Sequence, residues 1–501
     1  MKKIKFRLNE EIEKIIKKFN LSNVWNKGVT KDIQEYKKKK FKKKSFKRKN
    51  LKDLDFVTID GEDAKDFDDA VYCEKFEGSW KLYVAIADVA HYVENNSNID
   101  KEARKRGTST YFPGYVVPML PEILSNNLCS LRPSEDKYTI VAEILIGNDG
   151  KIKTYKFYNA LINSSARLTY NQVDEYLNNK NIIKDKNVAE NINNLFELYK
   201  ILKKSREKRN AVNFDTQEFS FVLDKNNEIK GLKNNVRLES QKLIEECMIM
   251  ANVASSLFIK KNKSASLYRV HDEPTLEKIE DASISLKNLG YTLSKSKIPN
   301  TEDINKLIEL ARKKLDDNLV TSILLRSMSR AEYTPKNIGH FGLALKSYNH
   351  FTSPIRRYPD LIVHRIIKNI IEKKESKYDF NNLEKIGLTC SENERNSESA
   401  ERELQSILLC NYATKFIGKT FTATVNSIVN FGLFISVIEE PIQGLIHISS
   451  LGNEYFIYNE KKNILIGDKS KKIYKIGDKI NVKLHSAFPS EKKIDFILAK
   501  K

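Results

Sequence analysis

Acidic residues crowd into one short stretch of the chain, TIDGEDAKDFDDA at residues 58–70. Asp60 ends a predicted buried strand, FVTID. Three more aspartates follow in a loop, and they are Asp66, Asp68 and Asp69. Carboxylates this close together repel one another unless a cation neutralises them. Any fold that this chain adopts must therefore leave the loop in solvent or bring positive charge to it.

The donor chemistry of these side chains suits a hard divalent cation. Carboxylate oxygens are preferred ligands of Mg²⁺ and Mn²⁺, and two such ions can activate water and stabilise a leaving oxygen during phosphodiester cleavage. A solvated acidic loop and a structural calcium site are the alternatives. The setting favours catalysis, because the acidic stretch follows an apolar strand in a chain with a formal net charge of +21. An enzyme that cuts a polyanion needs both features.

Composition limits the binding partners and the cellular location that we expect for this protein. The positive charge favours nucleic acid or the ribosome, although a biased genome also produces abundant Lys. No apolar run approaches the about 20 residues that span a bilayer, and charges interrupt the N-terminal stretch, so we expect neither a membrane partner nor a secretory signal. Five cysteines without a CxxC pair are typical of the reducing cytoplasm.

Four regions differ in character. Residues 1–50 form a basic segment that we expect to be partly disordered. Its stretch YKKKKFKKKSFKRKN is either a linker solvated by its own charge or a polyanion-binding arm, in which Phe41 and Phe46 could stack on bases. The other regions are an α+β domain at residues 51–375, a helical connector at residues 376–415 and a small all-β barrel at residues 416–498.

Strands gather early in the α+β region and helices gather late. KLYVAIADVAHYV and YTIVAEILI are rich in β-branched and aromatic residues and predict strands. SQKLIEECMIMANVASSLFIKK is apolar over a broad face, and PDLIVHRIIKNIIEKKE repeats apolar residues at helical spacing, so both predict helices.

The segment HFTSPIRRYPDLIVHR predicts an anion site. Ser353 could cap a helix with Pro354 at its first position, and Arg356 and Arg357 would then lie beside a helix start, where anions are favoured. Arginine binds phosphate bidentately, which suits a scissile phosphate. The alternative is an ordinary arginine pair that bridges to Asp360.

Several segments together resemble the signature motifs of the RNase II/RNase R (RNB) family. They are DGEDAKDFDDAVYCE, AIADVAHYV, RGTSTYFPGYVVPMLPEILSNNLCSL, KLIEECMIMAN, HFGLAL and HFTSPIRRYPDL, and they occur in the family's order. The spellings EDAKDFDD and RRYP resemble RNase R more than RNase II. The resemblance implies an α+β fold class, with an RNB-type catalytic domain followed by a small C-terminal all-β OB barrel.

The resemblance implies a processive exoribonuclease that enters single-stranded RNA at its 3′ end and releases nucleoside 5′-monophosphates. It implies a monomeric enzyme of RNA decay and processing that uses Mg²⁺, with Mn²⁺ as a substitute. The metal-holding carboxylates would be Asp60, Asp66, Asp68 and Asp69, and Asp69 is also assigned to the chemistry. Arg356 matches the arginine that contacts the phosphate.

Further matched positions are assigned to RNA binding. Tyr111 and Phe214 match an aromatic pair that clamps the terminal bases, and Glu246 matches a glutamate near the terminal sugar. Arg357 is expected to bind the RNA backbone. Stacking accepts any base, which suits an enzyme that degrades any sequence.

The barrel resembles the OB-fold RNA-binding domain of ribosomal S-one type. Phe431, Phe434 and His447 match its exposed aromatic and histidine positions. Because the two phenylalanines are three residues apart on a predicted strand, we expect at least one of them to lie in the barrel core.

Because only about 50 residues of this sequence precede the catalytic region, we expect it to lack the cold-shock domains that are usual in the family. A catalytically weak RNA-binding protein on a degenerate nuclease fold is the competing hypothesis, and a metal-dependent endonuclease is a third. A relic would be expected to have lost an aspartate of the cluster, and all four are present.

Overall fold

The computed structural model describes residues 7–38, 48–179, 182–214, 218–224, 228–293, 297–314 and 317–499. Most of the Lys-rich stretch, including Phe41 and Phe46 of the expected arm, lies outside these residues. Across the described chain, no helix is long and apolar enough to cross a membrane.

A seven-stranded sheet forms the centre of the larger part of the molecule, with strand order β1-β8-β7-β4-β3-β2-β9. The pairs β1–β8 and β2–β9 are parallel and the other neighbours are antiparallel. The strands are β1 (Lys49–Asn50), β2 (Val57–Asp60), β3 (Asp69–Phe76), β4 (Ser79–Ala87), β7 (Asp136–Ile146), β8 (Ile152–Asn163) and β9 (Ala166–Thr169). The strand predicted from KLYVAIADVAHYV ends at Ala87, because Asp88 caps the short helix α3 (Val89–Tyr92).

Three helices pack against this sheet. α7 (Glu239–Lys261) crosses β4, β7 and β8, α6 (Lys186–Lys208) lies on β3, and α11 (Tyr358–Ile371) lies on β8. α7 and α11 confirm the two predicted helices. α7 contacts the sheet and the other two helices, which explains why its apolar face is broad.

Smaller helices and hairpins surround this core. The helices are α4 (Asn98–Arg106), α5 (Tyr170–Asn178), α8 (Leu276–Asn288), α9 (Thr301–Lys313) and α10 (Asp317–Ser327). The paired strands are β5 (Thr110–Phe112) with β6 (Tyr115–Val117), β10 (Glu218–Leu223) with β11 (Ile229–Asn235), and β12 (Tyr268–His271) with β13 (Ala331–Thr334).

The C-terminal strands close into a barrel with the order β14-β15-β16-β21-β20, which confirms the predicted all-β region. Its strands are β14 (Thr420–Val429), β15 (Gly432–Val437), β16 (Gln443–His447), β20 (Lys479–Phe488) and β21 (Lys493–Leu498). A separate three-stranded sheet joins β17 (Phe456–Asn459), β18 (Ile464–Gly467) and β19 (Ile473–Lys475).

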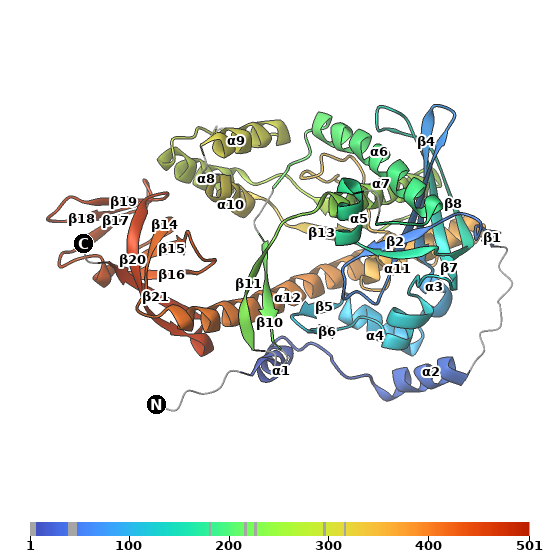
Figure 1. Ribbon diagram of the computed structural model, residues 1–501, viewed down its shortest axis with the longest axis horizontal. Coiled ribbons are helices and arrows are strands. Elements are labelled where there is room, and N and C mark those ends of the chain that lie inside the picture. The colour runs from blue at the N-terminus through green and yellow to red at the C-terminus, as the bar shows by residue number, and fades with distance from the viewer. Residues whose placement is uncertain are drawn as a thin grey trace.

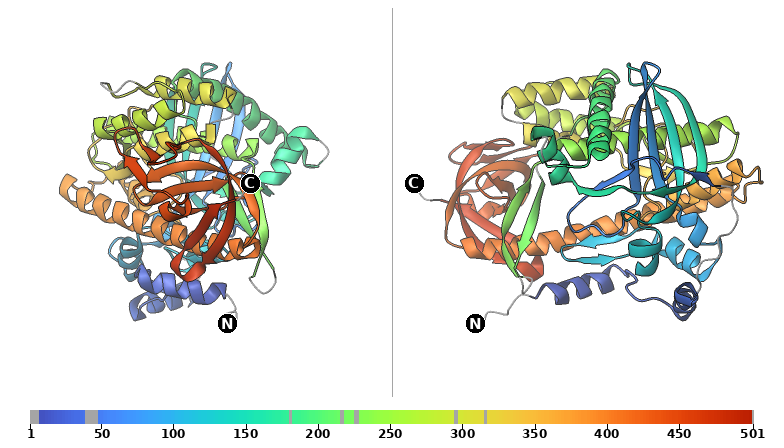
Figure 2. Two further views of the ribbon diagram at one scale, coloured as in Figure 1. Left: turned by 90° about the vertical axis from the view of Figure 1, so that its left-hand side faces the viewer. Right: turned by 45° about the vertical axis from the view of Figure 1, so that its right-hand side comes forward.

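One long helix, α12 (Phe380–Ala413), links the barrel to the central sheet. It packs against β20 and β21 at one end and against β5, β13 and α11 elsewhere. Figure 1 and the right-hand view of Figure 2 show it running from the barrel toward the sheet. Its apolar residues Leu404, Ile407 and Leu408 are buried.

Two N-terminal helices pack on the body of the protein. α1 (Leu8–Lys18) lies against α12, where Lys18 forms an ion pair with Glu403. α2 (Lys27–Lys38) lies against α4. Much of the segment that we expected to be partly disordered is therefore helical in the described residues.

Candidate active site

Two adjacent antiparallel strands bring the ends of the acidic stretch together. Asp60 ends β2, Asp69 begins β3, and the two strands pair through Val57 and Val71. The intervening loop therefore returns to the same edge of the sheet. Asp68, which is buried, immediately precedes β3 and accepts a hydrogen bond from the backbone N–H of Ile355 at 2.9 Å.

Burial raises the pKa values of all four carboxyls. It raises the pKa of Asp69 to about 7, and the charge of Asp60 adds to this rise. Burial also raises the pKa of Asp68 well above its ordinary value, and those of Asp60 and Asp66 by less. Carboxylates that are buried close together repel one another, so this arrangement is stable only when some of them are protonated or when a cation binds among them.

Arg356 acts on all four carboxyls of the cluster, and Arg167, which donates to the Gly61 and Glu62 carbonyls of the acidic loop, acts on Asp60 as well. The Arg356 guanidinium lowers the pKa of each of the four carboxyls, opposing the effect of their burial. Arg356 lies in a turn in which its backbone N–H and that of Arg357 both donate to the Ser353 carbonyl. Because Ile355 in the same turn is bonded to Asp68, the arginine and the acidic loop are held as one unit.

Arg357 lies next to Arg356 in sequence but pairs with a carboxylate of the protein itself. Its guanidinium donates to the buried carboxylate of Asp360 at 2.7 Å, so it forms the ion pair that was the alternative to RNA binding. Its extended backbone bridges to Thr108, and α11 therefore begins at Tyr358 and not at Pro354. Both arginines precede the helix.

Tyr111 lies beside the cluster on β5. Its side chain is 41% exposed, yet its hydroxyl hydrogen-bonds Asp66 and opposes the rise that burial causes in the pKa of that carboxyl. Its backbone N–H donates to Glu401 of α12 at 2.8 Å. The ring thus has one polar end at the carboxylates and an accessible face for a ligand.

Unlike Tyr111, Phe214 and Glu246 have contacts with residues outside the carboxylate cluster. Phe214 is partly buried against the hydrophobic cluster that includes the barrel and α8 to α10. Glu246 is buried on α7 and accepts from Arg206 of α6 at 2.7 Å. Burial raises the pKa of the neighbouring Cys247 thiol, and the charge of Asp69 adds to this rise.

The barrel exposes both predicted aromatic residues. Phe431 is 46% exposed and Phe434 is 40% exposed, and their rings meet edge to face with centroids 6.1 Å apart. The expectation that one of them lies in the core was wrong. Phe431 belongs to the turn before β15, where Gly432 has a φ of +155°, so the alternation of a strand does not apply to it. His447 is exposed and bonds Ser449 at 2.7 Å.

Comparisons with known proteins agree with this arrangement. A family model described as RNB domain matches residues 48–373, and one described as S1 RNA binding domain matches residues 414–496. The chain belongs to the RNB family. Ribonuclease R of Escherichia coli is 39% identical over 489 residues, which are 95% of this chain and 60% of that protein. Ribonuclease R of Vibrio cholerae is 43% identical over 460 residues, 89% of this chain and 56% of that protein.

A solved structure matches the fold as well as the sequence. Mycoplasma genitalium RNase R in complex with ribose methylated single-stranded RNA has a TM-score of 0.93 and 34% identity, and the match covers 98% of this chain and 78% of that one. This chain spans 60% of the length of the Escherichia coli relative.

The RNB carboxylates have the donor chemistry of a divalent-cation site. Among the described residues, no group of three or more His, Cys, Asp or Glu side chains is placed to hold a metal ion. Mg²⁺ usually binds through one or two carboxylates, waters and substrate phosphates, so it does not need a preformed protein cage. Four carboxyls whose pKa values stay raised although Arg356 opposes the rise fit such an ion.

Sequence reasoning missed Tyr170, the first residue of α5. Burial raises its pKa, and the charges of Asp60 and Asp69 raise it further, which places its ring beside the cluster. The local signal is the capping box of Thr169 and Gln172, which starts α5 directly after β9, the neighbour of β2. No pattern in the sequence predicts the ion pair of Arg206 with Glu246, because the two residues lie on separate helices.

Proposed function

We propose that this chain is a processive 3′→5′ exoribonuclease that hydrolyses single-stranded RNA to nucleoside 5′-monophosphates. One observation carries the proposal: Arg356 faces four clustered carboxyls beside the half-exposed ring of Tyr111. A guanidinium binds phosphate oxygens bidentately, so Arg356 would hold the scissile phosphate against the carboxylates. RNA as the substrate is supported by the Mycoplasma genitalium relative, which was solved with single-stranded RNA.

The metal is proposed to be Mg²⁺, with Mn²⁺ as a substitute, and its ligands would come from Asp60, Asp66, Asp68 and Asp69. When bound, a divalent ion supplies an activated water and stabilises the leaving oxygen. Arg356 orients the phosphate and offsets its charge. Burial of Asp68 and Asp69 strengthens these interactions, because charges act over a lower dielectric when water is excluded.

RNA is proposed to be held at two places. Tyr111 stacks on the 3′-terminal nucleotides, with Phe214 as its proposed partner, and Glu246 acts near the terminal sugar through its pairing with Arg206. Phe431, Phe434 and His447 on the barrel bind RNA further upstream, where stacking accepts any base. A cytoplasmic location is supported by the five cysteines, which are all free and buried.

Product sizing tests this proposal. With single-stranded RNA in excess and labelled at its 5′ end, Mg²⁺ should give a short labelled end product and unlabelled mononucleotides with few intermediates, and EDTA should stop the reaction. Defined internal fragments would instead indicate an endonuclease. Tight binding without any cleavage would indicate an RNA-binding protein on a nuclease fold.

A further inference from the structure

The segment that carries Tyr111 also contacts the segment that carries Arg356. The backbone N–H of Ser109 donates to the Arg356 carbonyl at 3.0 Å, and that of Tyr358 donates to the Gly107 carbonyl at 2.9 Å. We call the stretch from Gly107 to Tyr111 the lead strand. These backbone hydrogen bonds fix its position relative to the turn that carries Arg356. A shift of the lead strand moves both groups that would contact the RNA.

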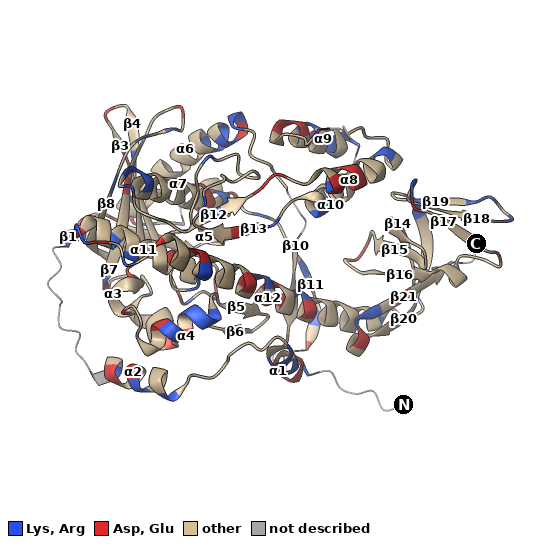
Figure 3. Ribbon diagram, turned by 180° about the vertical axis from the view of Figure 1, so that it is seen from behind, with Lys and Arg blue, Asp and Glu red and all other residues tan. Residues whose placement is uncertain are grey.

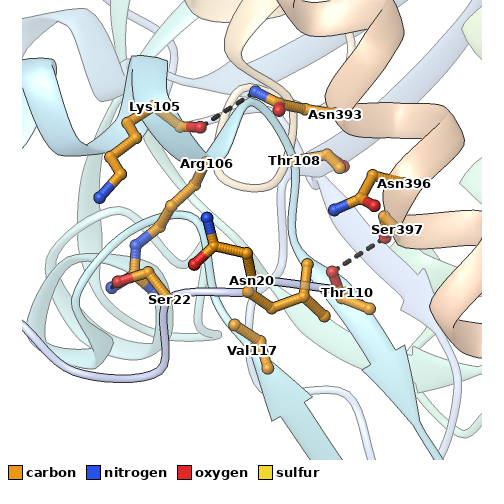
Figure 4. Close-up of a pocket in the computed structure, with 11 residues that line it drawn as sticks. Asn20, Ser22, Lys105, Arg106, Thr108, Thr110, Val117, Asn393, Asn396 and Ser397 are labelled. Carbon is orange, nitrogen blue, oxygen red and sulfur yellow. Dashed lines mark hydrogen bonds between the residues drawn. The ribbon is translucent and has the colours of Figure 1, made fainter. Parts of the chain in front are cut away.

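Alternation along the lead strand gives its two sides different partners. The Tyr111 side chain reaches the catalytic side, where its hydroxyl bonds Asp66, and the Ser109 hydroxyl accepts from the backbone N–H of Met119 at 2.9 Å. Thr110 is turned toward α12, where it accepts from Ser397 at 2.9 Å. Figure 4 shows the pocket behind the strand, with Thr110 and Ser397 on one side and Arg106 on the other.

Arg106, the last residue of α4, fastens the start of the lead strand. One guanidinium nitrogen donates to the Pro118 carbonyl at 2.8 Å, which joins the two ends of the β5–β6 hairpin. Another donates to the Val24 carbonyl at 3.1 Å. The third, Nε, donates to Glu102 at 3.0 Å. The side chain is only 4% exposed, and each of the three guanidinium nitrogens donates a hydrogen bond inside the protein.

The N-terminal segment completes this arrangement. The indole ring of Trp25 lies over the Arg106 guanidinium, 3.6 Å from ring centroid to carbon. Ser22 and Asn26 both donate to Glu102, the carboxylate that also binds Arg106. Residues 22–26 therefore close over the arginine from the side opposite the hairpin. The last turn of α4 is basic, as the blue ribbon in Figure 3 shows. The Arg106 side chain in this turn is buried.

Arginine is the side chain that this position requires. A guanidinium presents several N–H donors in a fixed plane and stacks on an aromatic face, whereas a lysine ammonium is a compact point charge. Lysine could satisfy one of the three acceptors. Lys105, the preceding residue, is exposed and uses only its backbone carbonyl, which accepts from Asn393 of α12 at 3.0 Å.

We propose that Arg106 is a positioning residue that clamps the lead strand between residues 22–26 and the β5–β6 hairpin, and so holds Tyr111 and Arg356 in register. Its described contacts are with Glu102, Pro118, Ser22, Val24 and Trp25, and not with the carboxylate cluster. It therefore acts through the lead strand. This inference rests on the proposed exoribonuclease function, because Tyr111 and Arg356 are assigned there.

The test compares Arg106→Met with Arg106→Lys and with Lys105→Met, which removes the same charge one residue away. Misplacing reacting groups by about 1 Å can lower a rate by about 100-fold. We expect Arg106→Met to lower kcat by about 10- to 100-fold and to lengthen the final oligonucleotide, while KM changes little. Arg106→Lys should recover part of the rate. Lys105→Met should keep the wild-type kcat and end product.

A second comparison separates positioning from general destabilisation. If Arg106 acts through Tyr111, then Arg106→Met should no longer change the length of the end product in a Tyr111→Ala background. Additive changes in product length would overturn the inference, as would wild-type kinetics in folded Arg106→Met. Should thermal melting show that Arg106→Met is unfolded, Trp25→Leu decides, because it removes the ring from the Arg106 guanidinium, keeps an apolar side chain against the core and leaves the hydrogen bonds of Arg106 in place. Unchanged products in folded Trp25→Leu would then overturn the inference. Wild-type protein that releases no mononucleotides would instead refute the proposed function.

Discussion

The carboxylate cluster and the aromatic face of the barrel differ in charge and in exposure to solvent. In the cluster, Asp68 is buried and Asp69 is partly buried, and the Arg356 guanidinium offsets the charge of all four carboxyls. On the barrel, Phe431 and Phe434 stand open to solvent beside an exposed histidine. Buried charges interact strongly and demand accurate placement, whereas stacking on an open face tolerates any base. Under the proposed function, the chemical step and RNA capture therefore lie in separate parts of the molecule, and α12 contacts both β5, which carries Tyr111, and the barrel strands β20 and β21.

The largest expected effect follows from removing one charge of the cluster. Asp69→Asn should lower the cleavage rate by at least about 100-fold, because loss of a metal contact removes several kcal/mol of transition-state stabilisation and about 1.4 kcal/mol is a factor of ten. RNA affinity should stay near wild type. Rates under single-turnover conditions and a filter-binding assay check both statements. Cleavage at the wild-type rate would show that Asp69 does not serve the chemistry.

Substitution of Arg356 and substitution of Arg357 should have different effects, the first on catalysis and the second on stability. Arg356→Ala should lower kcat by about 100-fold, because one preorganised donor to the reacting phosphate is lost, and should leave the fold intact. Arg357→Ala should lower the free energy of unfolding by about 3–5 kcal/mol, because it leaves the Asp360 carboxylate buried without its partner. Urea denaturation and kinetics on each folded variant separate the two effects. The same loss of kcat in both would contradict the contrast.

Tyr111 should affect where degradation stops and not whether it occurs. Stacking contributes about 1–3 kcal/mol per base, so Tyr111→Ala should release a longer final oligonucleotide while cleavage continues. A sequencing gel of the end products measures this. An unchanged end product would mean that the exposed face of the ring does not contact RNA.

The smallest expected effect is a dependence of stability on pH and metal. Because the pKa of folded Asp69 is about 7, above its ordinary value of 3.8, its contribution to stability is present at low pH and is lost as pH rises through about 7. The melting temperature in EDTA should therefore fall between pH 6.5 and 8. His340 stays neutral in this window, since burial lowers its pKa to about 3.

Divalent metal should counteract that fall. Mg²⁺ should raise the melting temperature more at pH 8 than at pH 6.5, because it competes with protons for the carboxylates. Asp69→Asn is the matched control and should show a smaller difference. An equal Mg²⁺ effect at both pH values would contradict a cation site in the cluster.

Local pattern predicted the strands, the main helices, the barrel and the acidic loop, because each depends on residues that are close in sequence. The spacing from Asp60 to Asp69 matched two adjacent strands joined by a loop. What the pattern could not distinguish was Arg356 from Arg357. Their roles divide because the backbone of Arg357 bridges to Thr108, which is remote in sequence.

Two further results depended on backbone geometry and distant contacts. Phe431 was expected to follow strand alternation, but it lies in a turn next to a glycine with positive φ. The contacts of Arg106 with Val24 and Pro118 join three segments, and no local periodicity reports such contacts.

The most direct test of the separation between chemistry and capture is the rate of mononucleotide release at saturating single-stranded RNA. It should be compared in wild type, Asp69→Asn and the double variant Phe431→Ala/Phe434→Ala. Stacking on the barrel adds about 1–3 kcal/mol per base to binding, so the double variant should raise KM and keep a near wild-type maximal rate. Asp69→Asn should lose the maximal rate. A maximal rate that falls equally in both variants would contradict the account, because the barrel would then take part in the chemical step.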